Sequence, residues 1–175
     1  MTQQPEVWLR GTVEGFPPLL MPVVHALLQV REDLTMLVTT VSPADVWARP
    51  GGAASIGFHV RHIGGALDRL ATYARGESLS AEQRAFLAGE GEPGTPPATM
   101  ADITAATIAT IDRALEQVRA TDVAELLEER RVGRAGLPSN PLGLLFHAAE
   151  HSTRHAGQVI TTARILSGRA GSGAP

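Results

Sequence analysis

Five of the six histidines in this 175-residue chain fall into two short segments. Histidine is the side chain that most often binds a transition metal, through a neutral ring nitrogen. The segment HAAEHSTRH holds His147, His151 and His155 at intervals of four residues. On an α-helix such residues share one face and rise about 6 Å per step, so a neighbouring pair can reach one ion but all three cannot. A third ligand must come from elsewhere in the chain.

The second segment, SIGFHVRHIGG, supplies His59 and His62. Three imidazole ligands would leave a coordination position for water or substrate, which is typical of catalytic rather than structural zinc sites. Taken alone, the pair His151 and His155 is equally consistent with two partly buried histidines that have hydrogen-bond partners. The residues themselves do not decide between His59 and His62 as the third ligand.

Four segments with apolar residues at helical spacing must position these histidines. The second is expected to begin after Ser55 as N-cap, the third after the capping box of Thr99 and Asp102, and the fourth at Asn140. Helices of about 20 residues are about 30 Å long, so the four expected helices match one another in length. We therefore predict an all-α fold, a four-helix bundle with long connections. The expected helices cover residues 20–41, 55–76, 100–119 and 140–167; a short helix within 80–89 and short strands between 122 and 137 are weaker expectations.

Composition excludes several classes of protein. The chain has no cysteine, and its fifteen basic residues are all arginine, which excludes thiolate metal sites, cysteine nucleophiles and Schiff-base lysines. A net charge of −3 and few aromatic residues argue against nucleic acid as a partner. No long apolar run suggests a membrane span or a targeting segment, so we expect a cytoplasmic protein. We expect a single domain over residues 1–175, loosely ordered at 1–15 and 168–175.

Two segments resemble the DinB/YfiT-like superfamily. In that family a serine-capped helix carries a metal-binding histidine seven residues after the serine, as Ser55 and His62 are spaced here. The family's last helix carries histidine, three residues, histidine, two residues and glutamine, matched by His151, His155 and Gln158. The resemblance implies a DinB-like four-helix bundle with a metal triad of His62, His151 and His155. Many relatives have histidine and arginine where this chain has Arg154 and Ala156.

The resemblance also implies a range of activities. Family members include metal-dependent thiol transferases that use bacillithiol, mycothiol-dependent isomerases and proteins linked by name to DNA damage. We expect a divalent ion, Zn²⁺ or Ni²⁺ first, a small-molecule substrate such as a low-molecular-weight thiol, and a homodimer. The main hypothesis is a metal-dependent transferase or hydrolase, with no catalytic side chain assigned beyond the ligands. The alternative is a non-catalytic ligand-binding or stress-response protein.

The remaining histidines and one rival motif have simpler interpretations. We expect His59 to line the site and His147 to lie one turn too far from it. The string HAAEH matches the H-x-x-E-H pattern of zinc proteases, with Glu150 as the base. That mechanism needs a further carboxylate ligand downstream, and no acidic residue follows His151. We therefore expect Glu150 to be a solvated residue that pairs with Arg154.

Overall fold

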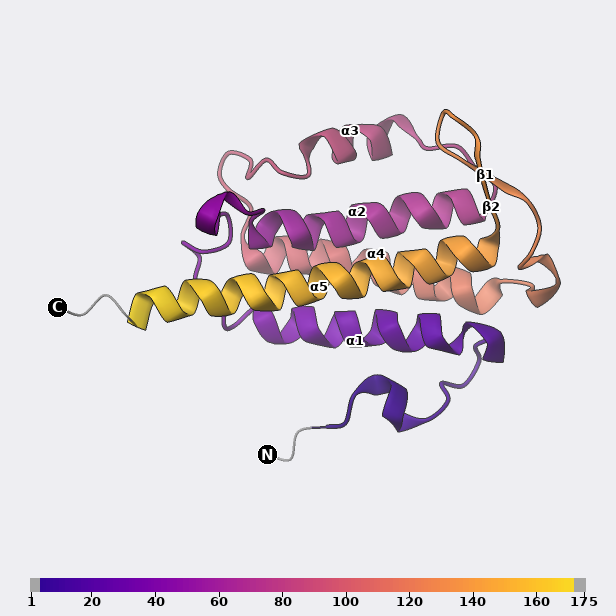
Figure 1. The fold of residues 1–175 in the computed structure, drawn as a ribbon, viewed down its shortest axis with the longest axis horizontal. Helices are drawn as coiled ribbons and strands as arrows, with labels where there is room; N and C mark the ends of the chain where they lie inside the picture. Colours follow the sequence, from indigo (N-terminus) through magenta and orange to yellow (C-terminus); the bar gives the residue numbers. More distant parts are fainter. Residues whose placement is uncertain (1–3, 172–175) are drawn as a thin grey trace.

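Four long helices run alongside one another in the structure, a computed structural model that describes residues 4–171 (Figure 1). Helix α2 packs against α5 and α4, and α1 packs against α5 and α4. The short helix α3 lies outside α2, and a small antiparallel hairpin, β1–β2, lies between α4 and α5 in the chain. The fold is therefore the expected all-α bundle. Its elements are α1 (Met21–Leu37), α2 (Ile56–Ala74), α3 (Ala81–Gly89), α4 (Met100–Ala120), β1 (Arg130–Val132), β2 (Leu137–Ser139) and α5 (Pro141–Gly171).

The helix starts follow the capping residues of the sequence. Ser55 Oγ accepts a hydrogen bond from the Phe58 amide at 3.1 Å at the start of α2. Thr99 and Asp102 form the expected capping box of α4. Asn140 Oδ1 accepts from the Gly143 amide at 2.8 Å. These bonds satisfy amides that have no partner within the helix, so each helix begins where its cap stands.

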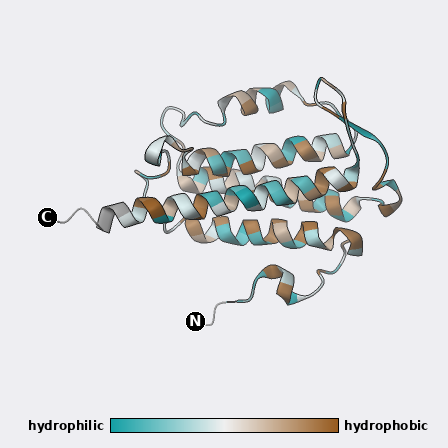
Figure 2. Cartoon of the chain, viewed as in Figure 1, coloured by the Kyte–Doolittle hydropathy of each residue, from teal (hydrophilic) through white to brown (hydrophobic). Residues whose placement is uncertain are grey.

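Aliphatic side chains from the four long helices fill the centre of the bundle. Figure 2 shows hydrophobic and hydrophilic residues interspersed along these helices, as expected where one face of each is buried. The interior holds few polar groups apart from threonines of α4 and the residues near the histidines. The packing of these aliphatic faces fixes how α2 and α5 lie against each other. Core side chains with no exposed surface are Leu20, Val24, Leu34, Ile56, Val60, Ile63, Ile111, Val118 and Val159.

Element boundaries differ from the expectation in two places. Helix α1 ends at Leu37, four residues before the expected end, and the amides of Thr40 and Val41 both bond to the Leu37 carbonyl in the turn that follows. Helix α5 continues past residue 167 to Gly171, and Leu166 near its end is buried. Burial of an apolar side chain stabilises a helix end beyond what local propensity predicts.

The two weaker expectations both correspond to real elements. Helix α3 forms within the expected residues 80–89. Strand β1 lies within residues 122–137 and pairs with β2 so that Arg130 lies opposite Ser139, but β2 begins at Leu137 and extends two residues beyond the expected range. At the N-terminal end, a 3-10 turn at Val7–Arg10 buries Val7. Loose order was expected for 1–15 and 168–175, of which 1–3 and 172–175 lie outside the described residues. None of the described helices is long and apolar enough to cross a membrane.

Candidate metal centre

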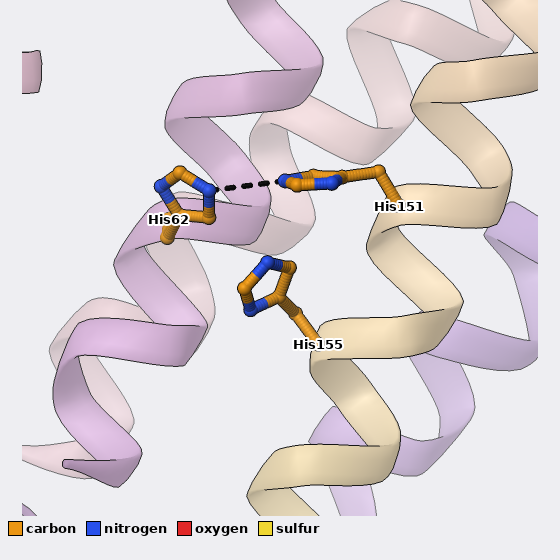
Figure 3. Close-up of side chains that lie close together, drawn as sticks. All are labelled: His62, His151 and His155. Atoms are coloured by element: carbon orange, nitrogen blue, oxygen red, sulfur yellow. Dashed lines mark hydrogen bonds between the residues drawn. The ribbon is translucent and has the colours of Figure 1, made fainter. Parts of the chain in front are cut away.

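Helices α2 and α5 bring three histidines to one point (Figure 3). His62 projects from α2, and His151 and His155 project from successive turns of α5. One ring nitrogen from each lies within 4.8 Å of the others. The Nε2 atoms of His62 and His151 are 3.0 Å apart. Residues separated by about ninety positions in sequence thus share one small space.

The nearest two nitrogens, those of His62 and His151, are spaced as two ligands of a single ion would be. At metal–nitrogen bonds of about 2.0–2.1 Å, two ligands of one ion lie roughly 3 Å apart. The 3.0 Å separation between His62 and His151 meets this condition. The nitrogen of His155 lies within 4.8 Å of the other two, and its ring centroid is 4.5 Å from that of His151. Imidazole ligands suit zinc, nickel, copper and iron alike.

A buried carboxylate holds the other side of the His62 ring. Glu90, the residue after α3, is only 2% exposed. Its Oε2 lies 2.7 Å from His62 Nδ1, and its Oε1 accepts from Arg69 Nη1 at 2.6 Å. Burial raises the pKa of Glu90, but the hydrogen bonds from His62 and Arg69 outweigh burial and lower the pKa below its usual value. The carboxylate is therefore ionised.

A fourth histidine supports the His155 ring. His59, on α2, is 7% exposed, and its Nδ1 lies 2.9 Å from His155 Nδ1. When His155 Nδ1 donates its proton to His59 Nδ1, the lone pair on His155 Nε2 is available to an ion. Burial and the neighbouring His62 lower the pKa of His59. His59 thus lines the site as expected and lies outside the group of three that converges.

Two of the converging rings, those of His151 and His155, resist protonation. Burial, followed by the neighbouring rings of His151, His62 and His59, lowers the pKa of His155 to about 4. Burial and then His62 also lower the pKa of His151. Its Nδ1 is buried without a hydrogen-bond partner among the described residues. Both rings are therefore neutral at pH 7, which is the form that binds metal ions.

The rest of the histidine row lies outside this cluster. His147 is 53% exposed in its side chain, and its ring centroid is 5.4 Å from that of His151. Glu150 pairs with Arg154 through bonds of 3.0 and 2.6 Å, so the interpretation of Glu150 as a solvated ion-pair residue is confirmed.

His25 bonds to the Gly11 carbonyl at 2.9 Å, far along the chain from these residues.

Sequence reasoning missed Glu90 and Arg69. Arg69 stands seven residues after His62, two helical turns away on the same face of α2, and a buried arginine requires an acidic or carbonyl partner. That signal was available. The identity of the partner was not, because Glu90 lies in an irregular connection after α3 and nothing in its spacing sets it apart from Glu77, Glu82 or Glu92.

A bundle whose two adjacent helices bring three imidazoles together belongs to the class of helical proteins that can hold a metal ion between helices. The sequence comparison identifies the family. Residues 26–159 match the family model of the DinB superfamily, and the chain belongs to that superfamily. No curated protein matches the chain in sequence.

Proposed function

We propose that this protein is a metal-dependent enzyme of the DinB-like type, with one divalent ion held by the Nε2 atoms of His62, His151 and His155. Zn²⁺ and Ni²⁺, which both accept neutral imidazole ligands, are the first ions to test. The observation that carries the proposal is the convergence of these three nitrogens within 4.8 Å. The low pKa of His155 adds support, since a neutral ring is the form that binds a metal ion.

The chemistry proposed for the site is activation of a small molecule for attack. A bound divalent ion acts as a Lewis acid and lowers the pKa of a water or thiol that reaches it. The chain has no cysteine, so a thiol would come from solution as a low-molecular-weight cosubstrate. Phe58 stacks on the His62 ring, with centroids 5.2 Å apart, and gives the site an apolar wall. Transfer of a thiol to an electrophile and hydrolysis by water are the two reactions proposed.

The proposal includes a homodimer and a cytoplasmic location. Phe146 supports the dimer, because this α5 side chain is 59% exposed and lines an apolar groove between α1 and α5. Exposed aromatic side chains of this kind are enriched at interfaces between proteins. Light scattering on a size-exclusion column measures the mass directly, and a monomer at micromolar concentration would contradict this part of the proposal.

The metal site is tested by elemental analysis of protein purified without an affinity tag. We expect about one divalent ion per chain. His151→Ala removes a ligand and should abolish stoichiometric binding, whereas His147→Ala, one turn away on the same helix, should retain it. Circular dichroism of both variants controls for folding. An ion retained equally by both variants, or no ion in the parent protein after incubation with Zn²⁺ or Ni²⁺, would overturn the proposal.

A conjugation assay separates the enzyme from a non-catalytic binding protein. Several thiols are incubated with several electrophiles and the metal-loaded protein, and loss of free thiol is followed. Turnover that disappears in His151→Ala and persists in His147→Ala supports the transferase. Hydrolysis of ester and amide substrates is followed with the same two variants. If the metal-loaded protein accelerates none of these reactions, the binding protein becomes the better account.

A further inference from the structure

Glu90 is placed where few carboxylates are found, in the interior and with both oxygens in use. Its Oε1 accepts from Arg69 Nη1 at 2.6 Å, and its Oε2 lies 2.7 Å from His62 Nδ1. Arg69 is itself 9% exposed. Burying a charged pair is unfavourable unless its geometry and remaining hydrogen bonds are good. The three groups meet that condition as a chain of arginine, carboxylate and imidazole.

The chain of contacts determines which nitrogen of His62 carries the proton. The ion pair with Arg69 Nη1 at 2.6 Å keeps Glu90 as a carboxylate, which can only accept, so His62 Nδ1 must donate to Glu90 Oε2. A neutral ring that has its proton on Nδ1 keeps a lone pair on Nε2. That Nε2 is the atom 3.0 Å from His151 Nε2, at the centre of the candidate metal site. A ring protonated on Nε2 instead could not bind an ion there.

We propose that Glu90, held by Arg69, is the positioning residue that fixes His62 with its proton on Nδ1 and its lone pair directed at the metal. This inference rests on the proposed metal site and adds the residues that prepare one of its ligands. Partners of this kind hold a metal-binding histidine in one tautomer and one orientation. The other two candidate ligands have no carboxylate partner of this kind: His155 faces His59, and His151 Nδ1 has no partner among the described residues.

The backbone of α2 leaves room for this arrangement. Gly65 lies between His62 and Arg69 on the same face of the helix. A Cβ at this position would overlap Glu90 Oε1 and lie 2.9 Å from Arg69 Nη1. The absence of a side chain therefore lets the carboxylate come close enough to α2 to reach both partners. Gly65, Arg69 and His62 on α2 together form the binding surface for the Glu90 side chain.

The substitution Glu90→Gln tests the assignment because Arg69 dictates how the new amide must turn. A guanidinium only donates, so the amide oxygen must face Arg69, and the NH₂ group then faces His62. Facing a donor, His62 Nδ1 becomes the acceptor and the ring proton moves to Nε2. We expect metal affinity to fall by about 10- to 100-fold. Competition between the full-length protein and a chromogenic chelator for Zn²⁺ or Ni²⁺ measures this change.

A second measurement reads the tautomer without any metal. In ¹⁵N-labelled, metal-free protein at pH 7.5, the ring nitrogen shifts of His62 distinguish a proton on Nδ1 from one on Nε2. We expect Nδ1–H in the parent protein and Nε2–H in Glu90→Gln. Glu92→Gln, an exposed acidic residue in the same connection, is the matched control and should change neither the tautomer nor the affinity.

The double variant Arg69→Met/Glu90→Gln provides a rescue. Without the guanidinium, the amide can turn its oxygen toward His62 Nδ1, so the proton returns to Nδ1. We expect this variant to bind metal more tightly than Glu90→Gln alone, which a merely structural role for Glu90 does not predict. Removal of the buried arginine also relieves the uncompensated charge that could prevent the single variant from folding.

The outcomes separate this inference from the proposed function. If the parent protein binds metal and Glu90→Gln has the same tautomer and the same affinity within about twofold, the role of Glu90 is wrong and the metal site stands. If the parent binds no metal, the proposed function fails, and the ¹⁵N shifts still show whether Glu90 fixes the His62 ring. A single variant that cannot fold leaves the double variant to decide, and an Nε2–H ring in the folded double variant would overturn the inference.

Discussion

His155 resists protonation in the folded chain because burial and the adjacent rings of His151, His62 and His59 lower its pKa to about 4. An unfolded chain has no such environment, and its histidines titrate near 6.5. Between these two values the unfolded state binds more protons than the folded state. The contribution of His155 to the unfolding free energy of the metal-free protein is therefore fully present above pH 6.5 and is lost as the pH falls toward 4.

We expect the metal-free protein to lose on the order of 2 kcal/mol of unfolding free energy from this residue between pH 7 and pH 4. Urea unfolding at several pH values in the presence of a chelator measures the loss. His155→Gln removes the group, so the stability of this variant should fall less over the same interval. Equal losses in the variant and the parent protein would show that His155 titrates normally in the fold.

At the level of single residues, the sequence is informative about candidate ligands and poor about their partners. Helical spacing singles out His151 and His155, and the resemblance to a known family adds His62. The contact between His59 and His155 follows from the packing of α2 on α5, which no local pattern specifies. Glu90 is harder still, because its burial results from a loop returning to α2 and from the missing side chain of Gly65.

Among the helices, α2 depends on its glycines for close packing. In Gly65→Ala the new Cβ would overlap Glu90 Oε1 and lie 2.7 Å from Phe86 Cε1. Alanine favours a helix over glycine by about 1 kcal/mol. We expect this gain to be outweighed by overpacking, which typically destabilises a protein by about 1–3 kcal/mol. Metal affinity should fall as well, since Glu90 is displaced from His62. Urea unfolding and chelator competition measure the two effects.

Gly157→Ala is the matched control on α5. It replaces an exposed glycine inside a helix, where a Cβ would meet nothing within 4 Å. Its stability should rise by up to about 1 kcal/mol with unchanged metal affinity. If Gly65→Ala behaves in the same way as Gly157→Ala, the close approach of Glu90 to α2 contributes nothing to stability or to the site.

Helix existence was predictable here because caps and apolar periodicity agree, as at Ser55 for α2 and Thr99 for α4. Helix ends were less predictable. The apolar spacing of α1 continues to Val41, yet the helix ends at Leu37, where two amides share one carbonyl. The strands β1 and β2 gave only a weak signal, since three residues each are too few for a clear alternation.

For the molecule as a whole, a metal ion would join α2 to α5 across about ninety residues of sequence. When the free concentration of an ion that binds only the folded state is 100 times its dissociation constant, the ion adds about 2.7 kcal/mol to the free energy of unfolding. For a protein of this size we expect the melting temperature to rise by roughly 5–10 °C. Differential scanning fluorimetry with and without Zn²⁺ or Ni²⁺ measures the shift. EDTA should reverse it, and His151→Ala should show none.

Which helices pack against each other was the hardest feature of the fold to predict from the sequence. Four amphipathic stripes specify a bundle but leave several arrangements open, and the resemblance to a known family narrowed them. That α2 lies against both α4 and α5, with α3 outside, depends on the summed complementarity of buried side chains such as Ile63 and Val159. Such complementarity is a property of the assembled interior.

Helix α3 has an unusual place in this molecule, because none of its nine residues is buried. An element with so little apolar contact opens at a small fraction of the free energy needed to unfold the whole domain, and amide hydrogen exchange should report fast exchange across residues 81–89. Each such opening would tend to draw out the adjoining Glu90. Brief opening of α3 would therefore free the His62 ring from Glu90. In the proposed metal-bound protein, the rate of metal exchange with solvent would then depend on how often α3 opens.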